Sequence, residues 1–129
     1  MLLKESWASL ADGTNVRWLK IFHLYKGFWR RCSHTSLFIK GSAQIVEPPQ
    51  ITYKGTKFKY SIKGDILRCI IIRTKKLSIT KSGIIAKTND NDLLAIKKRC
   101  LPKSKYTKGV VIKHALKRKK FLTLFPKIY

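Results

Sequence analysis

The side chains best suited to chemistry in this sequence are cations placed where apolar runs end. The stretch 66–72 reads ILRCIII, and three cations follow it within four residues. A guanidinium or ammonium group at the end of a rigid strand can hold a phosphate at a fixed position, although a solvated run of charges is the alternative. The same arrangement recurs after LLAI at 93–96. The predicted phosphate-binding residues are Lys63, Arg73, Lys75, Lys76, Lys97, Lys98 and Arg99.

A second candidate site interleaves aromatic rings with guanidinium groups. Phe28 and Trp29 directly precede Arg30 and Arg31. An aromatic face can stack on an unpaired base while a neighbouring guanidinium pairs with its phosphate, so Arg30 and Arg31 join the predicted RNA-binding residues. Packing of Trp29 into the core is an equally good interpretation.

Residues for catalysis or metal binding are poorly represented. The carboxylates are few, and most lie in turn sequences, where such side chains bond to nearby backbone. Asp90 and Asp92 could bind Mg²⁺ in a nuclease, but no base or nucleophile accompanies them. His23 and His34 lie near Cys32 without completing a four-ligand site. We therefore predict no catalytic residue, no metal and no cofactor.

The three cysteines indicate structure rather than chemistry. Cys32, Cys69 and Cys100 form no Cys-x-x-Cys pair, which argues against a zinc ribbon. Cys69 lies within the apolar run and is interpreted as a small buried residue.

Charge narrows the class of partner. The chain has 29 Lys and Arg against 6 Asp and Glu, a net charge of +23 on 129 residues. Such a charge repels itself unless a polyanion neutralises it. The cations interrupt strand-like segments instead of lining one amphipathic helix, which favours nucleic acid over a membrane surface. No apolar run approaches the roughly twenty residues that span a bilayer.

The pattern of apolar segments predicts a mainly β protein built as one domain, 1–129. Strands are expected at 16–25, 38–46, 51–53, 57–62, 66–74, 84–87 and 93–96, with turn residues between them. Phe58, Tyr60 and Ile62 share one face of their strand and are expected in the core. Residues 2–10 are expected to form a short helix or an irregular lead-in. A small barrel over about 10–100 would remove the exposed sheet edges. Near-helical apolar spacing predicts a short basic helical segment within 110–129.

Several motifs, in the same order along the chain, resemble the large-subunit ribosomal protein L14 family. The strongest is KGDILRCIIIRTKK at 63–76. LADGTNV at 10–16, SGIIAK at 82–87, NDNDLLAIKK at 89–98 and RKKFLTLFPKIY at 118–129 also resemble segments of that family. The stretches 28–59 and 102–113 depart from the family pattern.

The resemblance implies a fold, a function and partners. The fold would be a five-stranded barrel with a β-ribbon and a short C-terminal helical segment. The protein would bind large-subunit rRNA, contact small-subunit rRNA at an intersubunit bridge, and pack against ribosomal proteins of the L19 and L3 families. The counterparts of a docking surface for the ribosomal silencing factor would be Thr107 and Lys108.

Two further expectations concern location and alternatives. The excess of Lys over Arg and the many Ile residues resemble proteins from AT-rich genomes, and residues 1–5 do not resemble an import signal. We expect an organelle-encoded protein bound to ribosomes of the mitochondrial matrix, with the bacterial cytoplasm as the alternative. The alternative function is a free-standing single-stranded RNA-binding barrel that acts as an RNA chaperone or translation regulator. A metal-dependent nuclease is a third interpretation.

Overall fold

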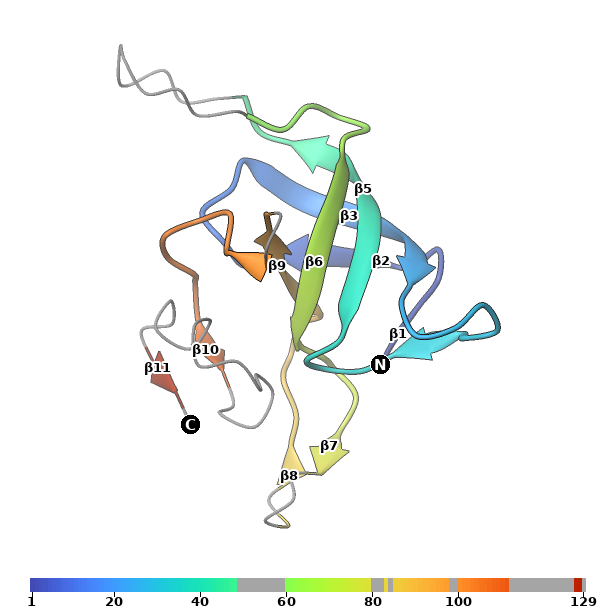
Figure 1. The fold of residues 1–129 in the computed structure, drawn as a ribbon. Helices are drawn as coiled ribbons and strands as arrows, with labels where there is room; N and C mark the ends of the chain where they lie inside the picture. The colour runs from blue at the N-terminus through green and yellow to red at the C-terminus, as the bar shows by residue number, and fades with distance from the viewer. Residues whose placement is uncertain (49–59, 80–82, 84, 98–99, 112–126, 129) are drawn as a thin grey trace.

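Five strands close into a barrel in the computed structural model, which describes residues 1–48, 60–79, 83, 85–97, 100–111 and 127–128. Around the barrel the strands follow the order β2-β3-β5-β6-β9 (Figure 1). β2 and β9 are parallel and close the barrel, and the other neighbours are antiparallel. The strand bounds are Trp7–Leu10 (β2), Val16–Leu24 (β3), Phe38–Val46 (β5), Ile66–Arg73 (β6) and Asp92–Ile96 (β9).

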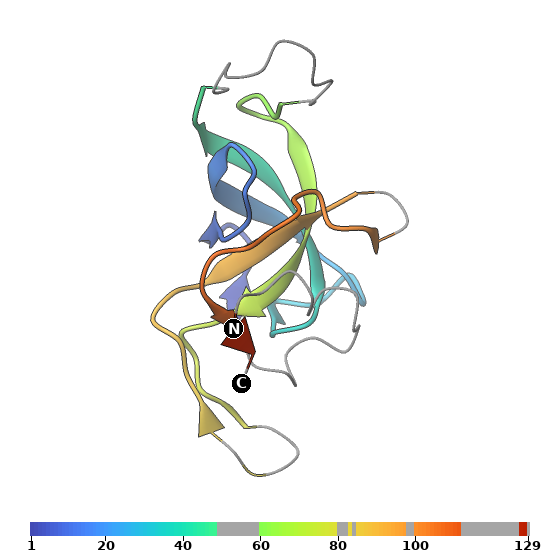
Figure 2. The same cartoon turned by 90° about the vertical axis from the view of Figure 1, so that its left-hand side faces the viewer.

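Three short strand pairs accompany the barrel. β1 and β4 are antiparallel, β7 and β8 form a ribbon that extends away from one end of the barrel (Figure 2), and β10 and β11 are parallel. Their bounds are Leu2–Leu3 (β1), Cys32–Ser33 (β4), Ser78–Ile79 (β7), Ile85–Ala86 (β8), Val110–Val111 (β10) and Lys127–Ile128 (β11). The predicted mainly β fold, with a five-stranded barrel and a ribbon, is therefore confirmed.

β6 is buried on both faces over Cys69–Ile72, as its mostly apolar sequence predicted. Leu67, Cys69 and Ile71 point into the barrel core, whereas Ile70 and Ile72 belong to a second apolar cluster. That second cluster also contains Ala11, Leu94, Ile96 and Val111. Each fully buried Ile or Leu contributes about 1.5–3 kcal/mol, so β6 anchors two cores at once. The cations that flank β6 are therefore attached to a strand that packs in both apolar clusters.

β3 leaves no room for a side chain at Gly41 of β5. A Cβ at Gly41 would overlap the side chain of Leu19 and lie 2.6 Å from the carbonyl oxygen of Lys20. The pairing of β3 with β5 also shifts register at three places, and such bulges bend and twist strands as closure of a small barrel requires.

Two predictions about the elements are wrong. Residues 2–10 form β1 and β2 instead of a helix or an irregular lead-in, with a turn at Glu5, whose φ is 64°. Tyr60 and Ile62 are not core residues, because they are 41% and 72% exposed. For the strand predicted at 57–62, the core face was chosen from the alternation of apolar and polar residues alone. Alternation does not show whether another element covers that face.

Other predictions fall on parts of the chain outside the described residues. These include the strand at 51–53, residue Phe58, and most of the C-terminal helical segment within 110–129. The two described ends of that last segment are the strands β10 and β11. Among the residues described, there is no helix long and apolar enough to cross a membrane.

Candidate nucleic-acid interface

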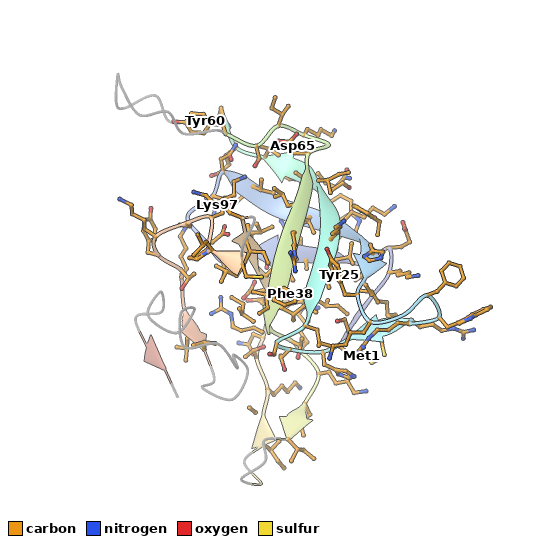
Figure 3. All side chains as sticks on the ribbon, viewed as in Figure 1. Met1, Tyr25, Phe38, Tyr60, Asp65 and Lys97 are labelled. Atoms are coloured by element: carbon orange, nitrogen blue, oxygen red, sulfur yellow. The ribbon has the colours of Figure 1, made fainter. Side chains whose placement is uncertain are left out.

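The predicted phosphate-binding lysines lie at both ends of β6. Because Arg68 of β6 pairs with Ile96 of β9, Lys97 lies at the end where β6 begins, which is also the end of the Lys63 turn. Lys97 and Asp65 are labelled in Figure 3. At the other end of β6, Lys75 and Lys76 are exposed where the ribbon of β7 and β8 leaves the barrel. Lys98 and Arg99 are not among the described residues.

The turn that presents Lys75 and Lys76 is held by hydrogen bonds. The backbone N–H of Lys75 donates to Oδ1 of Asn91 at 2.9 Å, and the hydroxyl of the buried Thr74 donates to the Lys76 carbonyl at 3.3 Å. The hydroxyl of Thr88 donates to the Thr74 carbonyl at 2.8 Å. The backbone under both lysines is therefore fixed, while their side chains remain exposed.

Arg73 makes internal contacts that its sequence position did not reveal. Its Nε lies 2.6 Å from Oδ2 of Asp92, and the two side chains are only 12% and 11% exposed. Its Nη1 and Nη2 donate to the carbonyls of Val110 and Lys108 at 2.8 and 3.0 Å. Gly109, with a φ of 82°, packs directly against the guanidinium. Arg73 thus fastens residues 108–110 to the barrel.

Several basic groups from distant parts of the sequence gather beside the β1–β4 pair. We call the Met1 amine, Arg30, His34 and Lys76 the N-terminal basic patch. The pKa of the Met1 amine is lowered by partial burial and by the charge of Lys76. The pKa of His34 is lowered by desolvation and then by the Met1 amine, Arg30 and Lys76. Leu3 of β1 pairs with Cys32, whose carbonyl accepts from Arg30, and the Lys76 ammonium lies 3.9 Å from Sδ of Met1. The Arg30 site and the Lys76 site, separate in the sequence, therefore both lie beside β1.

The aromatic-basic loop is exposed. Phe28 and Trp29 are 84% and 85% exposed, so the interpretation of Trp29 as a core residue is wrong. Arg30 is partly buried and its Nε donates to the carbonyl of Cys32 at 2.8 Å, whereas Arg31 is exposed. The loop stands out from the barrel beside β1 in Figure 1.

A second stack of cations and rings lies on the outside of the barrel. The guanidinium of Arg68 is 4.9 Å from the ring centroid of Phe38 and 5.4 Å from that of Tyr25. The ammonium of Lys40 lies 5.8 Å from the Tyr25 ring. Figure 3 labels both rings. Sequence reasoning missed this stack because Arg68 looks like an interruption of an apolar strand, and its partners come from β5 and from the end of β3.

The segment predicted to face a silencing factor contains one exposed and one buried residue. Lys108 is exposed, and its N–H donates to the carbonyl of Ala11 at 2.7 Å. Thr107 is only 5% exposed and forms a β-bridge with Asp12. Oδ2 of Asp12 accepts from the N–H of Ala95 at 2.8 Å, and burial raises the pKa of this carboxyl. Of the two residues, Lys108 is the exposed one.

The remaining acidic and sulfur groups have structural surroundings. Asp92 is 8% exposed, pairs with Arg73 and accepts a hydrogen bond from the hydroxyl of Ser9. Asp90 is exposed. Cys69 is buried, as predicted, and burial raises the pKa of its thiol. Within the described ranges, no group of three His, Cys, Asp or Glu residues is placed to hold a metal ion.

Comparison with known proteins agrees with the barrel and with the motifs. The family model described as ribosomal protein L14p/L23e matches residues 1–129. The large ribosomal subunit protein uL14m of Tetrahymena pyriformis is 34% identical over 125 residues, which cover 97% of each chain. The chain therefore belongs to the ribosomal protein L14p/L23e family.

Proposed function

We propose that this protein is a structural constituent of the large subunit of a mitochondrial ribosome, where it binds rRNA and performs no catalysis. The single observation that supports this most is the full-length family match, together with a mitochondrial relative that aligns over nearly the whole chain. A net charge of +23 on 129 residues fits a protein neutralised by rRNA.

The lysines at both ends of β6 are proposed to bind phosphates. Lys63 and Lys97 would serve one end, and Lys75 and Lys76 the other, with Lys98 and Arg99 extending the first group. Arg30 and Arg31 would continue the second group through the N-terminal basic patch. Shape recognition of A-form rRNA depends on such contacts, because side chains cannot read its deep major groove. Arg73 is proposed as a positioning residue that holds residues 108–110.

The family also supports a proposal about partners. We propose that one face contacts small-subunit rRNA at an intersubunit bridge and that neighbouring proteins of the L19 and L3 families pack against the barrel. The exposed Lys108 would contribute to a docking surface for the ribosomal silencing factor. In a pull-down of purified large subunits by that factor, Lys108→Glu should weaken capture, and unchanged capture would remove this part of the proposal.

Sedimentation tests the main proposal. Mitochondrial lysate is separated on a sucrose gradient in high salt, after low Mg²⁺ has split the subunits, and the chain is followed by mass spectrometry. The chain should move with the large subunit. A position at the top of the gradient would contradict the proposal and favour the alternative, a free-standing RNA chaperone or translation regulator. A bacterial ribosome would give the same migration from a bacterial lysate. The lysate in which the chain moves with the large subunit therefore also identifies the location.

A further inference from the structure

An open groove lies between β1 with its turn and the loop that joins β3 to β4. Its volume is about 480 Å³. The lining residues are Leu3, Lys4, Phe28, Trp29, Arg30 and Arg31. The groove adjoins the N-terminal basic patch, since Arg30 belongs to both.

Two large aromatic rings in this groove are left uncovered. Phe28 and Trp29 are 84% and 85% exposed, although full burial of a large apolar side chain is worth about 1.5–3 kcal/mol. The rings meet edge to face, with centroids 5.6 Å apart and an interplanar angle of 82°. Exposed aromatic pairs of this kind are typical of binding sites rather than of bare surface.

Hydrogen bonds from two side chains hold the backbone of the loop that carries the rings. The Nε of Arg30 donates to the Cys32 carbonyl at 2.8 Å, and the ammonium of Lys4 lies 3.5 Å from the Phe28 carbonyl oxygen. Lys26 has a φ of 75°, a conformation that a residue other than glycine adopts only when its surroundings impose it. The loop is therefore preorganised, which lowers the entropic cost of binding.

The charge of the groove selects an anion. Its lining contains three cations and no carboxylate. Glu5, which follows Lys4, forms an ion pair with Lys20 at 2.6 Å. An occupant must therefore offer a flat apolar face to the rings and negative charge to the guanidinium groups. An unpaired nucleotide offers both, whereas the bases of a duplex are already stacked inside it.

We propose that this groove binds unpaired nucleotides of RNA, with a base stacked on Trp29 or Phe28 and the adjoining phosphates against Arg30 and Arg31. The proposal rests on the proposed rRNA-binding function and names the RNA element that this part of the surface recognises. RNA backbone leaving the groove continues across the N-terminal basic patch toward Lys76.

Fluorescence can isolate this groove in the full-length chain. Trp7→Phe and Trp18→Phe leave Trp29 as the sole tryptophan. The probes are an RNA hairpin with a two-nucleotide bulge, the same hairpin fully paired, and the bulged hairpin with abasic sites at the bulge. The bulged hairpin should quench Trp29, and the other two should not.

Affinity provides the second readout. Trp29→Ala should weaken binding of the bulged hairpin at least about fivefold, equivalent to ~1 kcal/mol, and should leave binding of the paired hairpin within about twofold. Trp29→Phe should retain most of the preference, because it keeps a stacking face. Phe22→Ala is the matched control: Phe22 is 41% exposed on β3, outside the groove lining, and its loss should change neither affinity.

The outcomes separate this inference from the proposed function. Salt-dependent binding of all three RNAs with equal affinity and no selective quenching would overturn the groove assignment and leave the proposed function standing. Failure to bind any of them at low salt would overturn both. If Trp29 in the native ribosome cross-links to a protein instead of RNA, the occupant is a peptide and the assignment is wrong.

Discussion

Replacement of Arg73 by methionine separates a positioning role from direct phosphate contact. The guanidinium pairs with Asp92 at 2.6 Å and donates to the carbonyls of Lys108 and Val110. Methionine preserves much of the aliphatic volume but removes all three contacts. Asp92 would then remain as a nearly buried carboxylate whose remaining side-chain contact is the hydroxyl of Ser9.

The size of the effect follows from this burial. Breaking a buried ion pair by removing one partner costs about 3–5 kcal/mol, mostly because the other charge stays buried. Since the pair here is about one-tenth exposed, we expect a loss near the lower limit, about 3 kcal/mol. That is a large share of the roughly 5–15 kcal/mol by which domains are stable. The double variant Arg73→Met with Asp92→Leu should recover much of the loss, because no unpaired charge remains.

Two measurements on the same variants distinguish a positioning role of Arg73 from direct phosphate contact. Urea unfolding gives the free energy of unfolding, and binding to an rRNA hairpin over a range of salt concentrations gives the slope of log affinity against log salt. Arg73→Met should lower stability and leave the slope unchanged. The matched control, Lys75→Met with Lys76→Met, should change stability by less than about 0.5 kcal/mol and reduce the slope by about 0.7–0.9 per lysine.

The opposite pattern would contradict the positioning role of Arg73. If Arg73→Met reduced the salt slope while the free energy of unfolding stayed within about 0.5 kcal/mol of the wild type, Arg73 would be a phosphate-binding residue. The interpretation drawn from its sequence position would then stand, and its contacts with residues 108–110 would contribute little.

Three other substitutions or titrations test separate features. Gly41→Ala places a Cβ against Leu19 and should cost about 2–3 kcal/mol in urea unfolding, and a neutral result would show that β3 and β5 can move apart. The pKa of Asp12 is raised by burial, so its contribution to stability is fully present below pH 3.8 and is lost as pH rises through the folded pKa. Stability of the wild type relative to Asp12→Asn should therefore fall over that interval, and a constant difference would contradict the burial argument. The pKa of His34 should rise when RNA binds, because phosphates offset the surrounding cations. Lys76→Ala should raise the same pKa in the free protein. NMR titration would detect either shift or its absence.

Much of the barrel was predictable because most of its strands have recognisable local sequence patterns. The apolar run of β6 predicted burial on both faces, and the structure supplies a core for each face. β5 was predicted with its observed bounds, since the Pro48 turn ends it clearly. Residues 2–10 were not recognised as strands, because β1 consists of two residues and its partner Cys32–Ser33 lies far along the chain.

For the candidate site, the sequence indicated the exposed lysines but not the contacts of its arginines. The exposure of a charged side chain can be predicted from its residue type and from the strand that precedes it. Whether the charge forms an ion pair depends on a partner elsewhere in the sequence. Arg73 pairs with Asp92 because β6 and β9 are adjacent with a bulge between Ile71 and Arg73, which no local pattern reveals. The N-terminal basic patch likewise depends on contacts between distant segments: the pairing of β1 with β4 brings Met1 near Arg30, and Lys76, which follows β6, lies against Met1.

If the barrel presents these cations to the rRNA of a large ribosomal subunit, a density map of the native subunit should show rRNA phosphates within contact distance of Lys75, Lys76 and Arg30. The same map should show an unpaired base against Trp29. A map in which the N-terminal basic patch faces solvent, with no rRNA near either end of β6, would contradict rRNA binding by these cations.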